Sequence, residues 1–145
     1  MSSLRVEDAL ESVKYRVYPD TPVSEVIDLM VRRGAGAIPV VGDRYEVLGI
    51  ITAGDALREI VDDGGTDDVD GDGPVLARDI MTRAVLCVSE TQPLADAARM
   101  MANRKVNQLP VVREGELIGL ITREAVLQAL HQEAGGPTND KEEEA

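Results

Sequence analysis

Aromatic residues are nearly absent from this sequence, which has three tyrosines and neither phenylalanine nor tryptophan. The core must therefore be built from valine, isoleucine, leucine, alanine and methionine. Few aromatics also argue against a protein that binds nucleic acid by stacking bases on rings. Basic residues number 15 against 27 acidic ones, and a net charge of −12 would repel a phosphate backbone. We therefore expect no nucleic-acid partner.

The sequence also lacks a signal peptide and any apolar run close to the ~18 residues that cross a bilayer. We therefore expect a cytoplasmic protein without a membrane partner. Its single cysteine, Cys87, cannot form an intramolecular disulfide, and its apolar neighbours favour a small buried side chain over a reactive thiol. The acidic excess favours a salt-tolerant source organism, and an ordinary acidic cytosolic protein is an equally good interpretation.

Catalytic and metal-binding patterns are missing as well. The only histidine, His131, is predicted near the end of the last helix, and no cysteine–histidine cluster or nucleophile elbow is present. We therefore predict no enzyme, no metal ligands and no obligatory cofactor. The acidic segment 62–75 superficially resembles a calcium loop but lacks the required spacing, so a flexible linker is the favoured interpretation. A divalent-cation sensor is the weakest hypothesis.

What the sequence does contain is an internal repeat. Ala37-Ile38-Pro39-Val40-Val41 corresponds to Gln108-Leu109-Pro110-Val111-Val112, and Leu48-Gly49-Ile50-Ile51-Thr52 corresponds to Ile118-Gly119-Leu120-Ile121-Thr122. The offset is 71 residues up to the prolines and 70 afterwards. The chain therefore consists of two copies of one unit rather than of two unrelated halves.

Each copy is predicted to run strand, helix, strand, strand, helix, which is an α+β fold. Thr21 is a candidate helix N-cap with Pro22 at the first helical position, and Gly34 to Gly36 is a helix stop. Apolar residues then recur at helical spacing, and two β-branched runs flank a hairpin turn over 42–45. The predicted boundaries are an N-terminal helix at 1–12, repeats at 13–61 and 76–133, a linker at 62–75 and a disordered acidic tail at 134–145.

These residues resemble the CBS domain family, in which two tandem copies form a Bateman module. The resemblance rests on an apolar pair before a proline and two valines, then a turn, then Gly-Ile-Ile-Thr or Gly-Leu-Ile-Thr at a helix start, all occurring twice. Ala77-Arg78-Asp79-Ile80-Met81-Thr82 resembles the segment that precedes a copy, called here the lead-in segment. The first copy has only Val13-Lys14-Tyr15-Arg16 at the place where we expect its lead-in.

The resemblance implies a fold and a function. The two copies are expected to pack about a pseudo-twofold axis and to bind AMP, ADP, ATP or S-adenosylmethionine in the cleft between them. Such a module is non-catalytic: it senses the nucleotide, often as an energy sensor, and signals to a protein partner, usually as a homodimer. The alternative is a ligand-free CBS-type dimer that acts as an interaction scaffold.

The resemblance also implies the ligand-binding residues. Thr52 and Asp55 match the family pair that contacts the ribose hydroxyls, and a carboxylate that accepts two hydroxyls makes strong bonds. Thr-x-x-Asp is also a helix capping box, and both roles can coexist. The base is expected against an apolar surface with backbone groups nearby, formed by Ala37, Ile38, Pro39, Arg16 and Val17.

The second copy departs from this pattern, because Ala125 stands where Asp55 stands in the first copy. Its cleft is therefore expected to bind weakly, to bind another ligand or to be empty. The second-copy candidates for ligand contact, with Arg123 reaching a phosphate, are Thr122, Arg123, Leu109 and Pro110.

Overall fold

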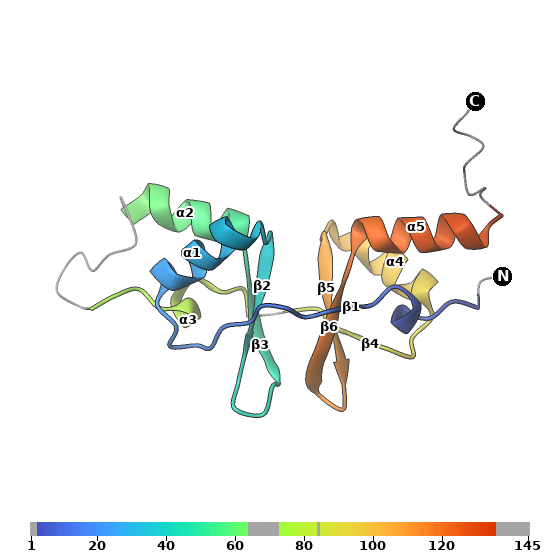
Figure 1. Cartoon of the computed structure of the whole chain (residues 1–145), viewed down its shortest axis with the longest axis horizontal. Helices are drawn as coiled ribbons and strands as arrows, with labels where there is room; N and C mark the ends of the chain where they lie inside the picture. The colour runs from blue at the N-terminus through green and yellow to red at the C-terminus, as the bar shows by residue number, and fades with distance from the viewer. Residues whose placement is uncertain (1–2, 64–72, 84, 136–145) are drawn as a thin grey trace. The chain divides into compact units, whose positions relative to one another are not determined.

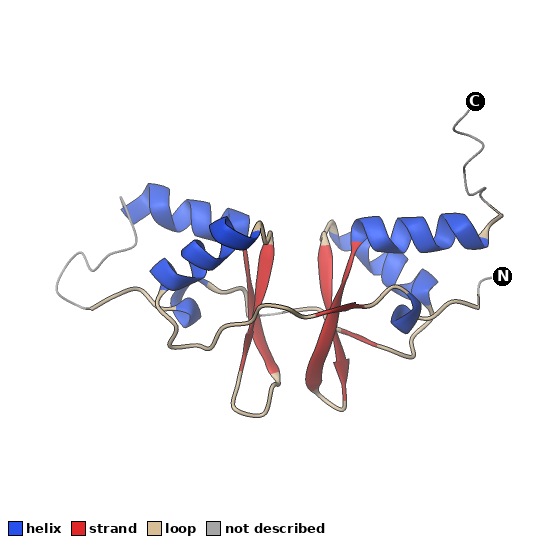
Figure 2. Cartoon of the chain, viewed as in Figure 1, coloured by secondary structure: helices blue, strands red, loops and turns tan. Residues whose placement is uncertain are grey.

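The computed structural model describes residues 3–63, 73–83 and 85–135. The chain is a mixture of helices and short strands (Figures 1 and 2). Its elements, in chain order, are η1 (Val6–Asp8), β1 (Glu11–Ser12), α1 (Val23–Arg33), β2 (Ala37–Val41), β3 (Val47–Thr52), α2 (Ala53–Asp63), α3 (Ala77–Ile80), β4 (Val88–Ser89), α4 (Leu94–Arg104), β5 (Gln108–Arg113), β6 (Glu116–Thr122) and α5 (Arg123–Glu133).

These elements form two compact units. The first-repeat unit comprises Lys14–Val85 and Gly115–Leu117, and the second-repeat unit comprises Met1–Val13, Leu86–Glu114 and Ile118–Ala145. The N-terminal segment therefore belongs with the second repeat. Of the predicted linker, residues 64–72 lie outside the described part of the chain, as do residues 136–145 of the predicted tail.

In the first-repeat unit, helix α1 buries Val23, Val26 and Met30, which lie on one face at helical spacing. The helix ends at Gly34, whose φ of 65° is left-handed, so the predicted stop is confirmed. The predicted N-cap is wrong by one residue. Pro22 is the N-cap, and the hydroxyl of Thr21 instead accepts a hydrogen bond from the Tyr18 amide over 3.0 Å.

Strands β2 and β3 form the predicted hairpin, with Ala37 opposite Thr52 and Ile38 opposite Ile51. Val17 forms a parallel bridge with Val40 on the outer side of β2. The helices of this unit lie on one side of β2 and β3, as Figure 2 shows. The buried members of its core are Val17, Val26, Met30, Ile38, Val40, Ile51, Ala56 and Ala77.

The second-repeat unit repeats this arrangement with helices α4 and α5. Its sheet has the order β1-β6-β5-β4, in which β4 pairs with β5 in parallel, as Val17 does with β2. A turn at Glu114 and Gly115 joins β5 to β6, and both residues have positive φ, as a tight hairpin turn requires. Buried residues such as Leu94, Leu109 and Ile121 form a separate core.

The two repeats exchange their lead-in segments. The Val6 amide donates to the Gln92 carbonyl over 2.9 Å, and 71 positions later the Ala77 amide donates to the Thr21 carbonyl over 2.7 Å. The N-terminal η1 segment thus packs on the second repeat, whereas α3 packs on the first. Val6 and Ala77 are both fully buried there.

This exchange corrects two predictions. The helix predicted at the N-terminus is a single 3-10 turn, because Glu11 and Ser12 pair with β6 and strand pairing requires extended backbone. The lead-in of the first copy is not Val13–Arg16 but the segment around η1, which occupies the same place on its unit as α3 does. The repeat therefore begins nearer the N-terminus than predicted.

One glycine in each hairpin allows the lead-in segment to approach closely. A Cβ on Gly49 would lie 2.8 Å from the Thr82 carbonyl oxygen, and a Cβ on Gly119 would lie 2.5 Å from the Glu11 carbonyl oxygen. Ordinary van der Waals contact begins at 3.4 Å, so neither position has room for a side chain. Backbone pairing of the lead-in segment therefore depends on glycine at both sites.

Candidate functional site

The junction of β3 and α2 carries the pair predicted to bind ligand. The amide and hydroxyl of Thr52 both donate to Oδ2 of Asp55, over 2.9 Å and 3.0 Å. The Asp55 amide in turn donates to Oγ1 of Thr52 over 3.3 Å. This reciprocal pattern is a capping box, so the structural role predicted for Thr-x-x-Asp is confirmed.

Asp55 is also exceptional in its burial. It is 8% exposed and is the one charged residue that is buried among the residues described. Burial of a charged group is costly unless the group is hydrogen-bonded, and here both oxygens of the carboxylate have partners. Oδ2 accepts from Thr52, and Oδ1 accepts from Nη2 of Arg58, one turn further along α2. Sequence analysis missed Arg58, although its three-residue spacing from Asp55 is a usual ion-pair spacing on a helix.

The first turn of α2 also offers a positive end. Of its leading amides, that of Ala53 donates to the Gly36 carbonyl and that of Asp55 to Oγ1 of Thr52, which leaves the amide of Gly54, and the helix dipole favours an anion at this position. The residue there, Gly54, is exposed, and a Cβ on it would meet nothing nearer than 3.7 Å. The Arg58 guanidinium lies close by, with Nη1 3.8 Å from that Cβ position. An anionic group could therefore approach the backbone beside Asp55.

The other first-repeat candidates lie on the strands next to this helix start. Ala37 is the β-sheet partner of Thr52, and the Ala53 amide donates to the Gly36 carbonyl over 2.9 Å. The Val17 amide donates to the Pro39 carbonyl over 3.0 Å, which holds the Arg16–Val17 segment against β2. Within the first-repeat unit, the structure therefore brings all seven predicted residues onto adjoining elements.

These seven residues do not all expose a side chain. Val17 and Ile38 belong to the core, and Pro39 is buried. Their backbone groups are already paired, since Val17 bonds to Pro39 and Val41 and Ile38 lies opposite Ile51, whereas Ala37 and Arg16 are only half-buried.

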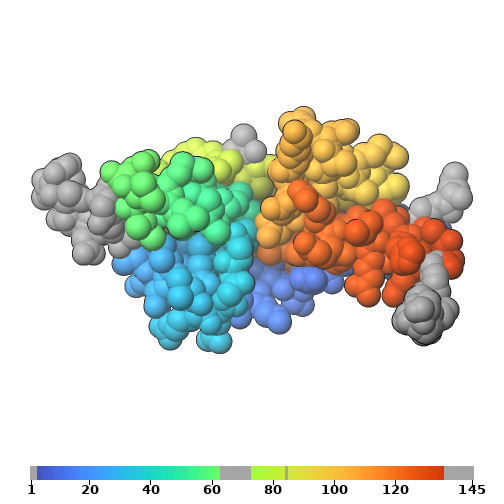
Figure 3. All heavy atoms as spheres, turned by 90° about the horizontal axis from the view of Figure 1, so that it is seen from above, coloured from blue at the N-terminus to red at the C-terminus, as the bar shows by residue number. Residues whose placement is uncertain are grey.

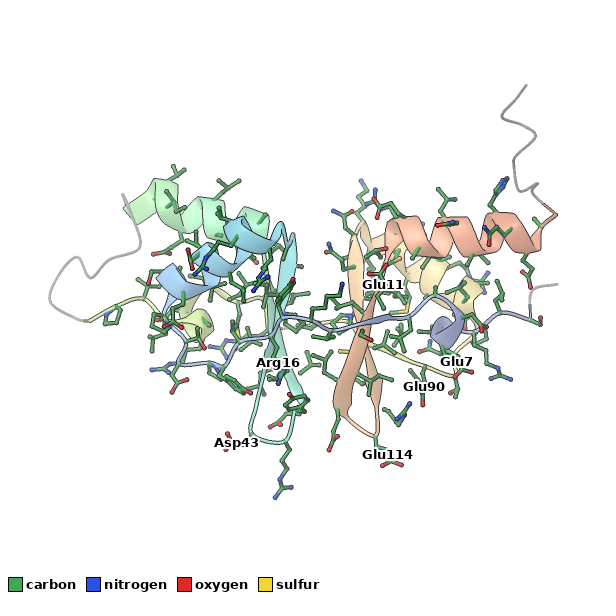
Figure 4. The ribbon with its side chains drawn as sticks, in the orientation of Figure 1. Glu7, Glu11, Arg16, Asp43, Glu90 and Glu114 are labelled. Atoms are coloured by element: carbon green, nitrogen blue, oxygen red, sulfur yellow. The ribbon has the colours of Figure 1, made fainter. Side chains whose placement is uncertain are left out.

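Arg16 has surroundings that sequence analysis did not anticipate. Its guanidinium stacks over the Tyr45 ring at 4.6 Å from the ring centroid, beside the β2–β3 hairpin (Figure 4). Its buried Nε has no hydrogen-bond partner among the described residues. A hollow of about 580 Å³ borders Arg16, Val17 and the exposed face of α1. Nothing in the sequence pattern linked Tyr45 to Arg16, since the hairpin alone brings them together.

The corresponding junction in the second repeat lacks a carboxylate. Oγ1 of Thr122 accepts from the Ala125 amide over 3.1 Å, so half of the capping box persists. Arg123 and Glu124 are exposed at the start of α5. Leu109 and Pro110 are buried, and Leu109 belongs to the core of this unit. The four second-copy candidates thus lie in the second-repeat unit without an acceptor equivalent to Asp55.

Charged and sulfur-containing groups elsewhere have ordinary structural surroundings. The Arg113 guanidinium donates twice to Glu90, over 2.6 Å and 2.7 Å, and this pairing lowers the pKa of the Glu90 carboxyl. Arg113 also lies near Glu114 and Glu7, and Figure 4 labels all three acids. Burial raises the pKa of the half-buried Cys87 thiol.

Among the described residues there is neither a cluster of metal ligands nor a helix that could span a membrane. No group of three or more histidine, cysteine, aspartate or glutamate residues is placed to hold a metal ion within ranges 3–63, 73–83 and 85–135. In the same ranges, no helix has the length and apolar character needed to cross a bilayer.

Comparison with known proteins decides the family. A sequence model of the CBS domain matches the chain twice, over residues 6–62 and 77–132. The chain belongs to the CBS domain family. The two matches start 71 positions apart and include η1 and α3, in agreement with the lead-in segments found in the structure. The α+β fold with two CBS repeats, predicted from the sequence, is confirmed.

Similar CBS pairs occur in several settings. CBSX1 of Arabidopsis thaliana, a chloroplastic CBS domain-containing protein, is 32% identical over 138 residues, which are 80% of this chain and 58% of CBSX1. The crystal structure of CBSX2 in complex with AMP superposes with a TM-score of 0.75 at 27% identity, covering 91% of this chain and 99% of that chain. Inosine-5'-monophosphate dehydrogenase of Halobacterium salinarum is 32% identical over 124 residues, 85% of this chain but 23% of the enzyme.

The matches cover only part of each curated relative, which limits what the relatives imply about this chain. The chain spans between 39% and 58% of five curated relatives that it matches. CBS pairs occur in a protein named for its CBS domains and within an enzyme, so family membership alone does not assign a role to this chain.

Proposed function

We propose that this CBS pair is a non-catalytic regulatory module that binds an adenosine nucleotide or S-adenosylmethionine beside Thr52 and Asp55. The observation that carries the proposal is the buried, ionisable Asp55 at the open start of α2. Its carboxylate suits two vicinal ribose hydroxyls, and the Gly54 amide at the positive end of the helix suits a phosphate. The similar CBSX2, which was crystallised with AMP, supports the same ligand class.

The proposal makes the two repeats unequal. The second repeat has Thr122 but carries Ala125 in place of a carboxylate, so it lacks the ribose acceptor. We therefore expect one ligand per chain, held by the first repeat. A module that distinguishes AMP from ATP would report the energy state of the cell, and this energy-sensing role, signalled to a protein partner, is part of the proposal. The cytoplasmic location stays a prediction.

Calorimetry tests the proposal directly. AMP, ADP, ATP and S-adenosylmethionine are titrated into the purified chain at high salt, which screens its net negative charge. The matched variants are Asp55→Asn and Asp96→Asn, because Asp96 also pairs with an arginine three residues later on a helix but has a side chain that is 43% exposed. We expect binding by wild type and Asp96→Asn, and none by Asp55→Asn. Equal binding by all three proteins would contradict the assigned site.

The second candidate function is a homodimeric interaction scaffold with empty clefts, and exposed apolar residues favour it. Val31, Leu57, Val61 and Leu127 are large apolar residues that face solvent on α1, α2 and α5. Leu57 and Leu127 occupy equivalent positions in the two repeats, so an exposed leucine occurs on both units, on helices α2 and α5, which Figure 3 shows from above. A groove of about 410 Å³ runs between α4 and α5 next to Leu127. A repeated apolar surface suits pairing with a second copy of the chain.

Light scattering distinguishes the dimer from a monomer. We expect twice the chain mass for wild type and the single-chain mass for the double variant Leu57→Glu/Leu127→Glu. Retention of the dimer by that variant would show that another surface is used. A dimer that binds none of the four ligands would select the scaffold over the nucleotide sensor.

A further inference from the structure

Arg58 occupies the carboxylate that the proposed ligand needs. Its guanidinium donates through Nη2 to Oδ1 of Asp55, while Oδ2 already accepts from the amide and hydroxyl of Thr52. The Asp55 side chain is 7% exposed, whereas that of Arg58 is 69% exposed. The capping bonds use Oδ2 to hold the helix start. A ribose hydroxyl that reaches Asp55 must therefore use Oδ1, the oxygen that Arg58 covers.

We propose that Arg58 makes the Thr52–Asp55 site select phosphorylated over unphosphorylated adenosine. The ribose hydroxyls replace Arg58 on Oδ1 of Asp55, and the released guanidinium binds the phosphate of the same ligand. This inference rests on the proposed function, since it names a specificity-determining residue for that site.

The exchange costs a nucleoside more than a nucleotide. Both ligands must break the ion pair with a nearly buried carboxylate, and only the nucleotide supplies a new anion for the guanidinium. Since Arg58 is largely exposed, its side chain can turn without disturbing the core. Its planar fork of donors matches a phosphate well, and its Nη1 already lies next to the open backbone at Gly54.

The charges around Arg58 strengthen this selection. A hollow of about 210 Å³ beside α2 is bordered by Asp55, Arg58, Glu59, Asp62 and Ile80. Three of these residues are acidic, and Arg58 is the single cation among the five. Without Arg58, a phosphate that entered this hollow would face the carboxylates of Asp55, Glu59 and Asp62 alone, and they would repel it.

Adenosine and AMP are the probes that test this inference, because they share base and ribose and differ in the phosphate. Their dissociation constants are measured by calorimetry for wild type, Arg58→Ala and Arg99→Ala. Arg99 is the matched control, since it pairs with Asp96 at the same spacing, has the same 69% exposure and belongs to the second-repeat unit. Arg58→Gln is measured too, as a variant that keeps a hydrogen-bonding side chain without the charge.

We expect Arg58→Ala to bind AMP about tenfold more weakly and adenosine about threefold more tightly than wild type. The preference for AMP over adenosine thus falls about thirtyfold in Arg58→Ala. We expect a similar fall in Arg58→Gln and the wild-type preference in Arg99→Ala. Equal weakening of both ligands in Arg58→Ala would overturn the inference, because it would show a purely structural role.

The outcomes separate this inference from the proposed function. Binding of AMP that Asp55→Asn abolishes, with an unchanged preference in Arg58→Ala, would overturn only the role of Arg58. Binding of neither probe by wild type and by Arg58→Ala, with no binding of ADP, ATP or S-adenosylmethionine either, would overturn both. Binding of adenosine by Arg58→Ala alone would support Arg58 as the competitor for Asp55.

Discussion

Substitution of Gly119 by alanine should separate the N-terminal lead-in segment from the second repeat. A Cβ at this position would lie 2.5 Å from the Glu11 carbonyl oxygen, about 0.9 Å inside the ordinary limit of 3.4 Å. The obstacle is backbone, so it cannot rotate away as a side chain could. Strand β1 must shift, and the pairing of Ser12 with Gly119 is disturbed.

The cost follows from overpacking at a well-packed position, about 1–3 kcal/mol of the free energy of unfolding. For a chain of this size, each kcal/mol lowers Tm by roughly 2–4 °C, so we expect a loss of about 3–10 °C. Melting followed by circular dichroism measures it. Gly49→Ala tests the equivalent contact with Thr82 in the first-repeat unit and should behave alike.

Gly54→Ala is the control, because a Cβ there meets nothing nearer than 3.7 Å. Alanine in a helix is favoured over glycine by up to about 1 kcal/mol, so this variant should melt at the wild-type temperature or above it. Wild-type melting of Gly119→Ala would refute the close approach of β1 and β6 on which the exchange of lead-in segments depends.

Three further predictions concern single groups. The Arg113 guanidinium lowers the pKa of Glu90 below its ordinary value of 4.5. Wild type should therefore be more stable than Glu90→Gln at neutral pH, and this difference in stability should disappear on acid titration through the lowered pKa. A difference that persists in strong acid would contradict the pairing. Since burial raises the pKa of the Cys87 thiol, iodoacetamide should modify it more slowly in the folded chain than in urea near pH 8, and equal rates would show an open thiol. Ala125→Asp should complete the capping box with Thr122 and raise the free energy of unfolding by about 0.5–1 kcal/mol, measured by denaturant titration. Lower stability would show that the half-buried site does not accommodate a carboxylate.

The repeat made much of the fold predictable. Both hairpins, the helices that follow them and the Gly34 stop lie in segments whose pattern is local, and local patterns survive folding. The capping box of Thr52 and Asp55 was predictable for the same reason, since its members are three residues apart.

The exchange of lead-in segments was not predictable from similarity between the copies. The segments around η1 and α3 share an aspartate, Asp8 and Asp79, at the 71-residue offset, but their apolar residues differ. Both aspartates accept a backbone amide three residues earlier, so the shared residue marks the turn. The segment around η1 packs against Gln92, which lies about 85 positions further along the chain. No local sequence pattern carries information about a contact over that separation.

The residues around the candidate site likewise include some that the sequence could predict and some that it could not. Arg58 could have been found from its spacing to Asp55, whereas the stacking of Arg16 on Tyr45 depends on the path of the hairpin. The identity of the ligand depends on groups that only a folded chain assembles.

The most direct test of the account is the melting temperature of wild type, Asp55→Asn and Asp96→Asn with and without AMP. At about 100 times its dissociation constant, one bound ligand should stabilise the wild-type chain by ~2.7 kcal/mol. The account predicts this shift for wild type and Asp96→Asn and its loss in Asp55→Asn. An equal shift in all three proteins, or none in wild type with any of the four adenosine ligands, would contradict it.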